Sequence, residues 1–319
     1  MKTIGILTSG GDAPGMNSAI RATVRTALNN GMRIKGIRNG FDGLMKGDTY
    51  EMNVSSVADI IHKGGTILGT ARSTEFEKPE GQKKAAQILK DYGIEGLIVI
   101  GGDGSYKGAK ALSDLGIKTV GIPGTIDNDM GYTDFTIGFF TAIETVIDAI
   151  GKLRDTSSSH GRAVVIEVMG RHCGDLALYA GLAGGAESII VPEHKFSIDE
   201  IVEKVNHGRK RGKLHHLITL AEGVGNPYTV AKEVEERSGV ETKVTILGHV
   251  QRGGSPSAVD RLLGSIMGAK ATELLKEEKT NIALGYTNGE IIQVSLDEAV
   301  KIEGDFDETL YELANRLSK

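Results

Sequence analysis

Short apolar runs of strand-forming residues alternate with segments of helical periodicity along most of this chain, and few folds satisfy such a pattern. The strand-type runs lie at 3–8, 34–37, 96–100, 119–122, 162–168, 188–191, 217–221 and 243–247. The helix-type segments lie at 17–29, 81–92, 106–115, 140–153, 198–205 and 257–275. Because parallel strands are joined by helical crossovers, this order predicts an α/β fold with helices on both faces of parallel sheets.

The length of the chain fits a globular protein with two cores. At 319 residues, it exceeds the size at which one hydrophobic core usually divides. Apolar residues make up 39% and charged residues 25%, a balance that excludes wholesale disorder. No Ser- or Pro-rich linker marks the division, so we place it near residue 138, at the start of the long helix.

Charge and cysteine content narrow the classes of function. The formal net charge is −5, which gives no global attraction to nucleic acids or anionic membranes. The single cysteine, Cys173, cannot form a disulfide within the chain and favours a reducing compartment. The N-terminal apolar run is too short for a signal peptide, and no stretch reaches membrane-spanning length. We therefore expect a cytoplasmic protein that binds neither nucleic acid nor membrane.

Two glycine-rich clusters, Thr8–Asn17 and Gly101–Ser105, directly follow predicted strands. In such folds ligands bind beyond the carboxyl ends of the strands. Glycines let backbone N–H groups approach an anion, and the helix N-terminus that follows favours negative charge. A nucleotide phosphate site is one interpretation of the first cluster. A plain turn between strand and helix, which favours the same residue types, explains it equally well.

Asp103 distinguishes the second cluster from the known phosphate loops. The pattern GxxxxGK[ST] is absent. The pattern G-x-G-x-x-G is also absent, because the spacing between Gly104 and Gly108 is one residue longer than the pattern requires. An acidic residue in a phosphate loop repels phosphate unless a cation intervenes, so we interpret Asp103 as a Mg²⁺ ligand. The alternative is an aspartate that caps the following helix.

The segment Pro123–Asp129 carries two carboxylates two residues apart at a strand end. One of Asp127 and Asp129 can hold a metal while the other accepts a proton from a substrate hydroxyl. The alternative is an Asx-type turn. We expect Asp103 and Asp127 to converge on one cleft as an oxygen-rich metal and base site.

Basic residues at the ends of predicted elements complete the candidate site. Most Arg and Lys side chains are solvated surface groups. Arg171 and Arg252, however, lie in glycine-flanked turns that suit a phosphate clamp. Glu222, at a strand end, can accept sugar hydroxyls or pair with an arginine. Taken together, these groups predict phosphoryl transfer from a nucleotide to an alcohol that already carries an anion.

Two other classes of function remain open on the residues alone. A dinucleotide oxidoreductase shares the strand–glycine–helix pattern, but its fingerprint is misspaced here and it leaves Asp127 and Asp129 unexplained. A non-catalytic sugar-phosphate sensor explains the basic residues but not Asp103 together with Asp127.

The sequence resembles the bacterial ATP-dependent 6-phosphofructokinases over essentially its whole length. The resemblance rests on six motifs in family order and spacing: TSGGDAPGMN (8–17), GGDGS (101–105), PGTIDND (123–129), MGR (169–171), AEG (221–223) and GHVQRGG (248–254). It implies two three-layer, Rossmann-like domains with parallel sheets. One would bind ATP, at 1–138 plus about 251–301, and the other fructose 6-phosphate, at 139–250 plus about 302–319.

The resemblance also implies the roles of residues in transfer of the γ-phosphoryl group of Mg-ATP to the 1-hydroxyl of fructose 6-phosphate, a reaction of glycolysis. Asp127 would be the base, Asp103 would hold Mg²⁺, and the other catalytic residues would be Arg72, Thr125, Asp129 and Arg171. ATP would contact Gly11, Arg72, Ser73, Gly102, Asp103, Gly104, Ser105 and Gly108. The sugar phosphate would contact Thr125, Ile126, Asp127, Arg162, Met169, Gly170, Arg171, Glu222, Lys243, His249, Val250, Gln251 and Arg252.

The resemblance further implies a homotetramer and an effector site. Arg162 and Lys243 would reach the active site of a neighbouring subunit. ADP would activate and phosphoenolpyruvate inhibit from an interface site. That site would be formed by Arg21, Ala22, Thr23, Val24, Arg25, Arg154, Gly185, Ala186, Glu187, Arg211, Lys213, Leu214 and His215.

The chain departs from the family pattern at a few positions. Lys243 stands where arginine is usual, and lysine cannot form a bidentate fork with phosphate. Phe41 replaces a common tyrosine near the adenine, and Glu77 replaces a common basic residue. Charges often found near the effector are missing at Val54 and Leu214. Gly104 and Gly124 match the branch that uses ATP, whereas pyrophosphate-using relatives typically carry Asp and Lys there.

Overall fold

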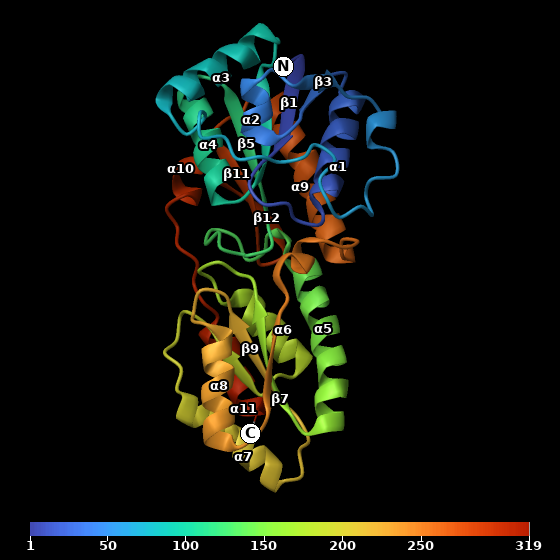
Figure 1. Ribbon diagram of the computed structural model, residues 1–319. Helices are drawn as coiled ribbons and strands as arrows, with labels where there is room; N and C mark the ends of the chain where they lie inside the picture. Colours follow the sequence, from blue (N-terminus) through green and yellow to red (C-terminus); the bar gives the residue numbers. More distant parts are fainter. Residues whose placement is uncertain (319) are drawn as a thin grey trace. The chain divides into compact units, whose positions relative to one another are not determined.

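The computed structural model describes residues 1–318 and divides the chain into two compact units. Unit 1 comprises Met1–Ile126, Met130–Thr141 and Arg252–Gly304. Unit 2 comprises Asp127–Asp129, Ala142–Gln251 and the chain from Asp305 onward. Each unit is a sheet covered by helices, as Figure 1 shows.

The sheet of unit 1 has the strand order β12-β11-β5-β4-β1-β2-β3, with β6 paired to β5. Its strands are β1 (Thr3–Thr8), β2 (Arg33–Ile37), β3 (Thr49–Glu51), β4 (Gly96–Gly101), β5 (Lys118–Thr125), β6 (Ile137–Gly138), β11 (Ile282–Thr287) and β12 (Glu290–Ser295). The strands from β11 to β2 are parallel, whereas β3 and β12 pair antiparallel at the two edges. Strands β1 and β4 are fully buried, as their continuous apolar runs require.

Helices cover both faces of this sheet (Figure 1). On one face, α2 (Gly40–Met45), α3 (Pro79–Asp91), α4 (Asp103–Asp114) and α10 (Leu296–Ala299) contribute apolar side chains to a shared core. On the other face, α1 (Met16–Asn29) packs along α9 (Ala258–Lys276). A Cβ on Gly268 would lie 2.4 Å from the carbonyl oxygen of Ala19, so glycine permits this close approach of the two helices.

The sheet of unit 2 is entirely parallel, with the order β10-β7-β9-β8. Its strands are β7 (Ala163–Val168), β8 (Ser188–Ile190), β9 (His216–Ala221) and β10 (Thr242–Ile246). Apolar side chains of α7 (Ile198–Lys210) and α8 (Pro227–Ser238) form a core with β7 and β9. The remaining helices are α5 (Phe139–His160), α6 (Asp175–Gly184) and α11 (Glu308–Leu317), and α6 packs against β8 and β9.

The predicted α/β fold with helix-covered parallel sheets is confirmed, and each strand-type run coincides with a strand. The antiparallel edges depart from the prediction. The β11–β12 hairpin has a turn at Asn288 and Gly289, whose φ angles of 52° and 86° suit a two-residue turn. Helices α2, α6, α8, α10 and α11 were not predicted either, and α5 continues to His160 rather than ending near 153.

Candidate functional site

In unit 1, three sequence motifs meet at one edge of the sheet. Strands β1, β4 and β5 are neighbours, and the glycine-rich clusters and Thr125 follow their carboxyl ends. The register pairs Thr8 with Ile100 and Gly101 with Pro123, which places the strand ends side by side. The backbone N–H of Ser9 donates to the carbonyl of Ile100 at 2.9 Å. The first glycine loop is therefore hydrogen-bonded to the end of β4, directly before the second loop.

Glycine is required where the two loops touch. A Cβ on Gly101 would lie 2.3 Å from the Ser105 hydroxyl oxygen and 2.4 Å from the Ser9 carbonyl oxygen. The Ser105 hydroxyl is buried and has no hydrogen-bond partner within residues 1–318. At Gly104, by contrast, no atom lies within 4 Å of an added Cβ. The first turn of α4 is thus crowded on the loop side and open on the other.

Asp103 is the first residue of α4. Its single carboxylate fits a magnesium ion whose other ligands come from a bound phosphate and water. Its side chain is 31% exposed, and Oδ2 accepts from Lys107 Nζ at 2.7 Å. No group of three His, Cys, Asp or Glu side chains in the described chain could hold a metal alone. Mg²⁺ commonly binds through one or two carboxylates together with substrate phosphates and water. A single partly exposed carboxylate at a strand edge meets that requirement.

The basic residues of unit 1 reach the same loops. The Arg252 guanidinium packs over Gly11, where a Cβ would lie 1.8 Å from Nη1. The Thr70 hydroxyl donates to the Gly10 carbonyl at 2.6 Å, which brings the segment with Arg72 and Ser73 beside the first loop. The Arg72 side chain is exposed.

Gly108 lies on the inner side of α4 rather than at its open start. A Cβ there would lie 2.6 Å from the ring of Phe41, which stacks on Phe76 with ring centroids 4.1 Å apart. Phe41 is 5% exposed. Phe76 therefore covers one face of the Phe41 ring, and both rings belong to the core of unit 1.

In unit 2, the segment Asp127–Asp129 is fastened through its central residue. Asn128 has a left-handed φ of 53°, and its Nδ2 donates to Asp175 Oδ2 at 2.9 Å. Burial raises the pKa of Asp175, and the hydrogen bond from Asn128 opposes that shift. The sequence analysis assigned no role to Asn128 or Asp175. Asp175 is the first residue of α6, where an acidic residue is common, so the sequence does not mark it as part of a site.

Asp129, Arg171 and Glu222 form a chain of contacts. Arg171 Nη1 lies 3.4 Å from Asp129 Oδ2, and the Arg171 backbone N–H donates to Glu222 Oε1 at 2.8 Å. Arg171 has a left-handed φ of 58°. Glu222 thus holds the strained backbone of Arg171, while the Arg171 side chain stays 59% exposed. Met169 and Gly170 directly precede this turn.

The loop after β10 is tied to the same turn. Gln251 is fully buried, and its Oε1 accepts from the Met169 backbone N–H at 3.2 Å. Its Nε2 donates to the Gly248 carbonyl at 3.0 Å. Gln251 therefore fixes the short helix Gly248–Arg252 next to the Met169–Arg171 turn, while His249 and Val250 stay exposed.

Arg162 and Lys243 lie at the other end of this sheet. Arg162 precedes β7 and pairs with Glu241, and Lys243 Nζ lies 2.7 Å from Glu241 Oε1. Residues 169–171 and 249 follow the carboxyl ends of β7 and β10. A six-residue strand spans roughly 20 Å, so one phosphate cannot touch both groups within one chain. Glu241, which the sequence analysis missed, holds the two basic side chains together.

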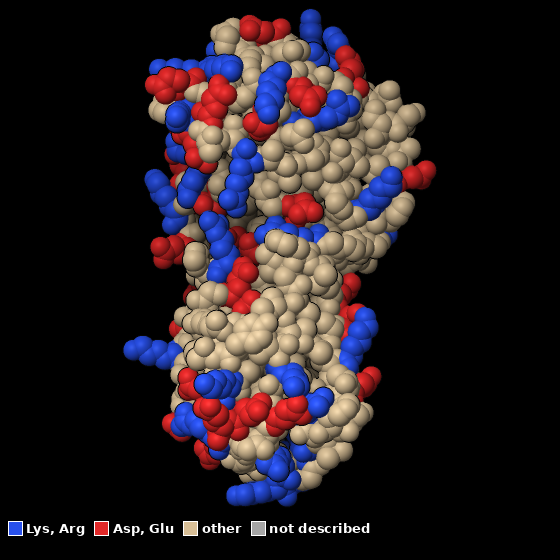
Figure 2. All heavy atoms as spheres, viewed as in Figure 1, with Lys and Arg blue, Asp and Glu red and all other residues tan. Residues whose placement is uncertain are grey.

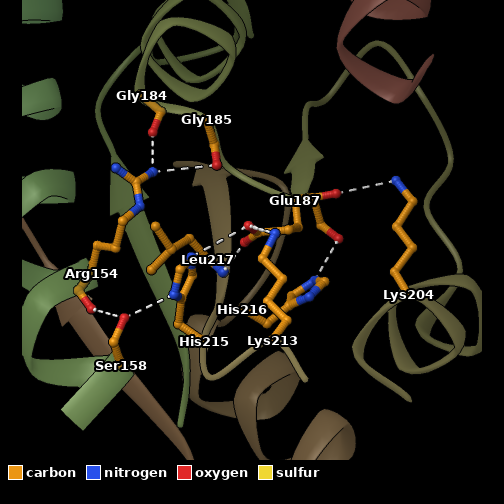
Figure 3. A network of polar contacts seen from close by, with 11 residues as sticks. Arg154, Ser158, Gly184, Gly185, Glu187, Lys204, Lys213, His215, His216 and Leu217 are labelled. Carbon is orange, nitrogen blue, oxygen red and sulfur yellow. Dashed lines mark hydrogen bonds and ion pairs between the residues drawn. The ribbon is translucent and has the colours of Figure 1, made fainter. Parts of the chain in front are cut away.

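A second cluster of polar side chains surrounds Glu187 (Figure 3). Lys213 forms an ion pair with Glu187, and His215 Nε2 lies 3.7 Å from its Oε1. The Leu217 backbone N–H donates to Glu187 Oε2 at 2.6 Å. Burial lowers the pKa of His215 and lowers that of its neighbour His216 to about 4.

Arg154 joins the cluster from α5. It donates to the carbonyl oxygens of Gly184 and Gly185, at 3.3 Å for Gly185 (Figure 3). Ala186 is buried, and Leu214 is 61% exposed. Unit 2 therefore groups the predicted effector residues 154, 185–187, 211 and 213–215.

The predicted effector residues 21–25 belong to unit 1 and lie on α1. Arg25 is exposed and Arg21 partly so. Thr23 and Val24, in contrast, are fully buried, and the Thr23 hydroxyl donates to the Gly268 carbonyl at 3.2 Å. The Thr23 side chain therefore faces α9 and Val24 is enclosed in the core, so within 21–25 only Arg21 and Arg25 offer charge to a ligand.

Several other features bear on the class of function. Burial raises the pKa of the Cys173 thiol, which makes it a poor nucleophile. Cationic and anionic side chains are interspersed over the face shown in Figure 2. No helix among the described residues is long and apolar enough to cross a membrane. The convergence of Asp103 and Asp127 stays a prediction, because these residues belong to different units.

Comparisons with known proteins agree on one family. A family model described as Phosphofructokinase matches residues 3–275. The chain is 66% identical over 318 residues to the ATP-dependent 6-phosphofructokinase of Finegoldia magna and 62% identical to that of Clostridium tetani, with 100% of each chain covered.

Solved structures show the same likeness. Phosphofructokinase from Saccharomyces cerevisiae matches with a TM-score of 0.91 at 35% identity, over 98% of this chain and 50% of the yeast chain. This chain therefore spans half the length of that protein. A pyrophosphate-dependent phosphofructokinase from Marinobacter aquaeolei matches with a TM-score of 0.85 over 96% of this chain and 86% of its own. At 21% identity, that match shows a likeness of fold alone.

Proposed function

The chain belongs to the phosphofructokinase family, and from this premise we propose that it transfers the γ-phosphoryl group of Mg-ATP to the 1-hydroxyl of fructose 6-phosphate. The products are fructose 1,6-bisphosphate and ADP. The observation that carries the proposal is the open, glycine-lined start of α4 with Asp103 at its first position. An open helix N-terminus favours phosphate, and a carboxylate beside it favours a magnesium ion.

In this proposal unit 1 is the ATP-binding domain. ATP lies against the two glycine loops and the start of α4, and Arg72 reaches its phosphates from the segment that Thr70 fastens to the first loop. The proposed contacts are Gly11, Arg72, Ser73, Gly102, Asp103, Gly104 and Ser105, together with Gly108, which lies behind them on the buried side of α4. Asp103 holds Mg²⁺, which supplies positive charge to the phosphates when it is bound.

Unit 2 is the sugar-phosphate domain, and unit 1 contributes Thr125, the last residue of β5, and Ile126, which follows it. Asp127 accepts the proton of the 1-hydroxyl, and Asp129 aims the Arg171 guanidinium at the charge that develops during transfer. The remaining contacts come from Met169, Gly170, Glu222, His249, Val250, Gln251 and Arg252. The Gln251 bond to Met169 supports this grouping, because it links two of the predicted sugar-binding segments.

The separation of Arg162 and Lys243 from the other sugar-binding residues supports an oligomer. These side chains lie about 20 Å from the Arg171 turn along the sheet, so they serve a site on a second copy of the chain. Exposed apolar side chains on α9, at Val259, Leu262 and Ile266, also favour contact with another copy. We infer a homotetramer that works in the cytoplasm.

The Glu187 cluster is proposed as half of an effector site for ADP and phosphoenolpyruvate at a subunit interface, with Arg21 and Arg25 of a neighbouring copy of the chain as the other half. Lys213 and His215 lie against the buried Glu187 carboxylate, and Arg154 binds the adjacent Gly184 and Gly185 carbonyls, so three basic side chains are available to an anion (Figure 3). The Lys213–Glu187 ion pair would have to open when such a ligand binds.

A coupled assay tests the proposed function. With fructose 6-phosphate, Mg-ATP is expected to support turnover, Mg-pyrophosphate is expected to fail, and phosphoenolpyruvate is expected to lower the rate. Turnover with Mg-pyrophosphate but not with Mg-ATP would show that pyrophosphate, rather than ATP, is the phosphoryl donor. A change in nicotinamide absorbance without added coupling enzymes would favour an oxidoreductase. Binding of fructose 6-phosphate without turnover would favour a sensor.

We expect Lys243→Arg to lower the KM for fructose 6-phosphate. Arginine presents a planar fork that contacts two phosphate oxygens, whereas lysine offers a single point charge. Initial rates at varied sugar phosphate and saturating Mg-ATP measure the effect. Lys195→Arg, an exposed change in the same unit, is the matched control and should leave KM unchanged. An equal or higher KM in Lys243→Arg would show that the family's arginine brings no gain here.

A further inference from the structure

Asp260 is a fully buried carboxylate that belongs to none of the six motifs. It lies in the first turn of α9 with 0% exposure. Its Oδ1 accepts from the Gly138 backbone N–H at 2.8 Å. Its Oδ2 accepts from the Thr141 backbone N–H at 2.8 Å, the Thr141 hydroxyl at 2.5 Å and the Ser257 hydroxyl at 3.0 Å. Four donors on one buried side chain exceed what capping of its own helix requires.

The Gly138 bond connects Asp260 to the end of β5. Gly138 belongs to the two-residue strand β6, which pairs with β5 through Gly124↔Ile137 and Thr125↔Gly138. The Thr136 hydroxyl donates to the Thr125 carbonyl at 2.7 Å and holds the same pair from the other side. Asp260 thus anchors the backbone of β6, against which Thr125 is paired.

Asp260 also touches the first glycine loop. A Cβ on Gly15 would lie 3.1 Å from the Asp260 Cβ and 2.7 Å from Ile137. A Cβ on Gly138 would lie 2.7 Å from the Ala13 Cβ. The loop, β6 and the start of α9 therefore pack around the Asp260 carboxylate so closely that glycine is needed at positions 15 and 138. All three segments belong to unit 1.

We propose that Asp260 is a positioning residue that fixes the end of β5, with Thr125, relative to the glycine loop that receives ATP. The proposal rests on the proposed function for its catalytic consequence. Thr141 and Ser257 extend the anchor, because the Thr141 hydroxyl also accepts from the Ser257 backbone N–H at 2.9 Å. Asp260 acts through backbone, and it touches neither reactant.

Asp260→Asn is the sharpest variant because it keeps the shape of the side chain. A carboxamide has one acceptor oxygen, and its nitrogen only donates. The hydroxyls of Thr141 and Ser257 can turn to accept from that nitrogen, but the N–H groups of Gly138 and Thr141 cannot. Whichever way the amide points, one backbone N–H meets a second donor and is pushed away.

The matched control is Thr272→Val on the same helix. Thr272 is also 0% exposed, and its hydroxyl donates to the Gly268 carbonyl at 2.9 Å, far from β6 along α9. We expect Asp260→Asn to lower kcat about 10- to 100-fold with little change in either KM, since misplacement by about 1 Å costs that much. Thr272→Val should change kcat less than about twofold at a temperature where both variants are folded.

Hydrogen exchange separates this inference from the proposed function. In Asp260→Asn, peptides covering 122–129 and 136–142 should exchange faster than in the unmodified protein, while in Thr272→Val they should not. This comparison needs no catalysis, so it decides the inference even if the unmodified protein has no kinase activity. Unchanged exchange in these peptides, or an equal kcat loss in Thr272→Val, would overturn it.

Thr141→Val covers the case in which Asp260→Asn does not fold. It removes one hydroxyl donor and leaves the carboxylate and both backbone bonds in place. We expect the same two peptides to exchange faster and kcat to fall by less than in Asp260→Asn. No change in either quantity would contradict the positioning role.

Discussion

Asp127→Ser is expected to lower kcat by about two to four orders of magnitude, within or just above the range of general-base catalysis. Serine cannot take up the proton of the 1-hydroxyl at neutral pH, and it removes a carboxylate from a segment that is only 8% exposed at Asp127. Binding should be largely retained, because other residues are proposed to hold the phosphates of both substrates. Initial rates with Mg-ATP and fructose 6-phosphate measure kcat, and titration calorimetry measures binding.

Asp155→Ser is a suitable control, since Asp155 is an exposed carboxylate on α5. It should leave kcat and both KM values as they are. Turnover of Asp127→Ser within tenfold of the unmodified protein would reject the assignment of Asp127 as the base. Loss of sugar-phosphate binding in the same variant would instead assign it a binding role.

A second large effect is expected from Gly104→Asp. An added Cβ meets open space at this position, so the fold should tolerate the side chain. Its carboxylate would stand beside Asp103 where the ATP phosphates are proposed to lie, and a like-charge contact costs several kcal/mol. We expect kcat/KM for Mg-ATP to fall about 100-fold or more, measured at saturating fructose 6-phosphate.

Gly104→Asn separates charge from size in this experiment. Its side chain matches aspartate in shape but is neutral, so its loss of kcat/KM should be much the smaller of the two. Thermal unfolding of both variants checks that the start of α4 remains intact. Equal losses in the two variants would mean that steric exclusion, rather than charge, accounts for the effect, and that phosphate does not approach Gly104 closely.

The parallel core of each sheet could be predicted from the sequence because its strands are buried on both faces. Continuous apolar runs such as Thr3–Thr8 and Gly96–Gly101 leave little ambiguity. The edge strand β12 lacks such a run, since polar residues interrupt it and none of its residues is buried. The Asn288–Gly289 turn was a usable signal.

It could also be predicted that the polar motifs after β1, β4 and β5 lie at one edge of the sheet, because the carboxyl ends of parallel strands share an edge. What could not be predicted were the supporting partners. Glu241, Asp175 and Asp260 are distant in sequence from some of the groups they hold, and nothing local marks them. The resemblance to phosphofructokinases is confirmed, whereas the individual residue roles stay predictions.

Arg162 and Lys243 lie at the strand starts of unit 2, away from the Arg171 turn, and in the proposed oligomer this placement would link sugar-phosphate binding to protein concentration. A lone copy would keep a folded sheet and an intact proton acceptor, yet would lack two positive charges for the tail of its sugar. Dilution below the assembly constant should therefore weaken sugar capture long before it unfolds the chain. Rates measured at nanomolar protein would then be lower, per molecule of enzyme, than the rates at cellular protein concentrations.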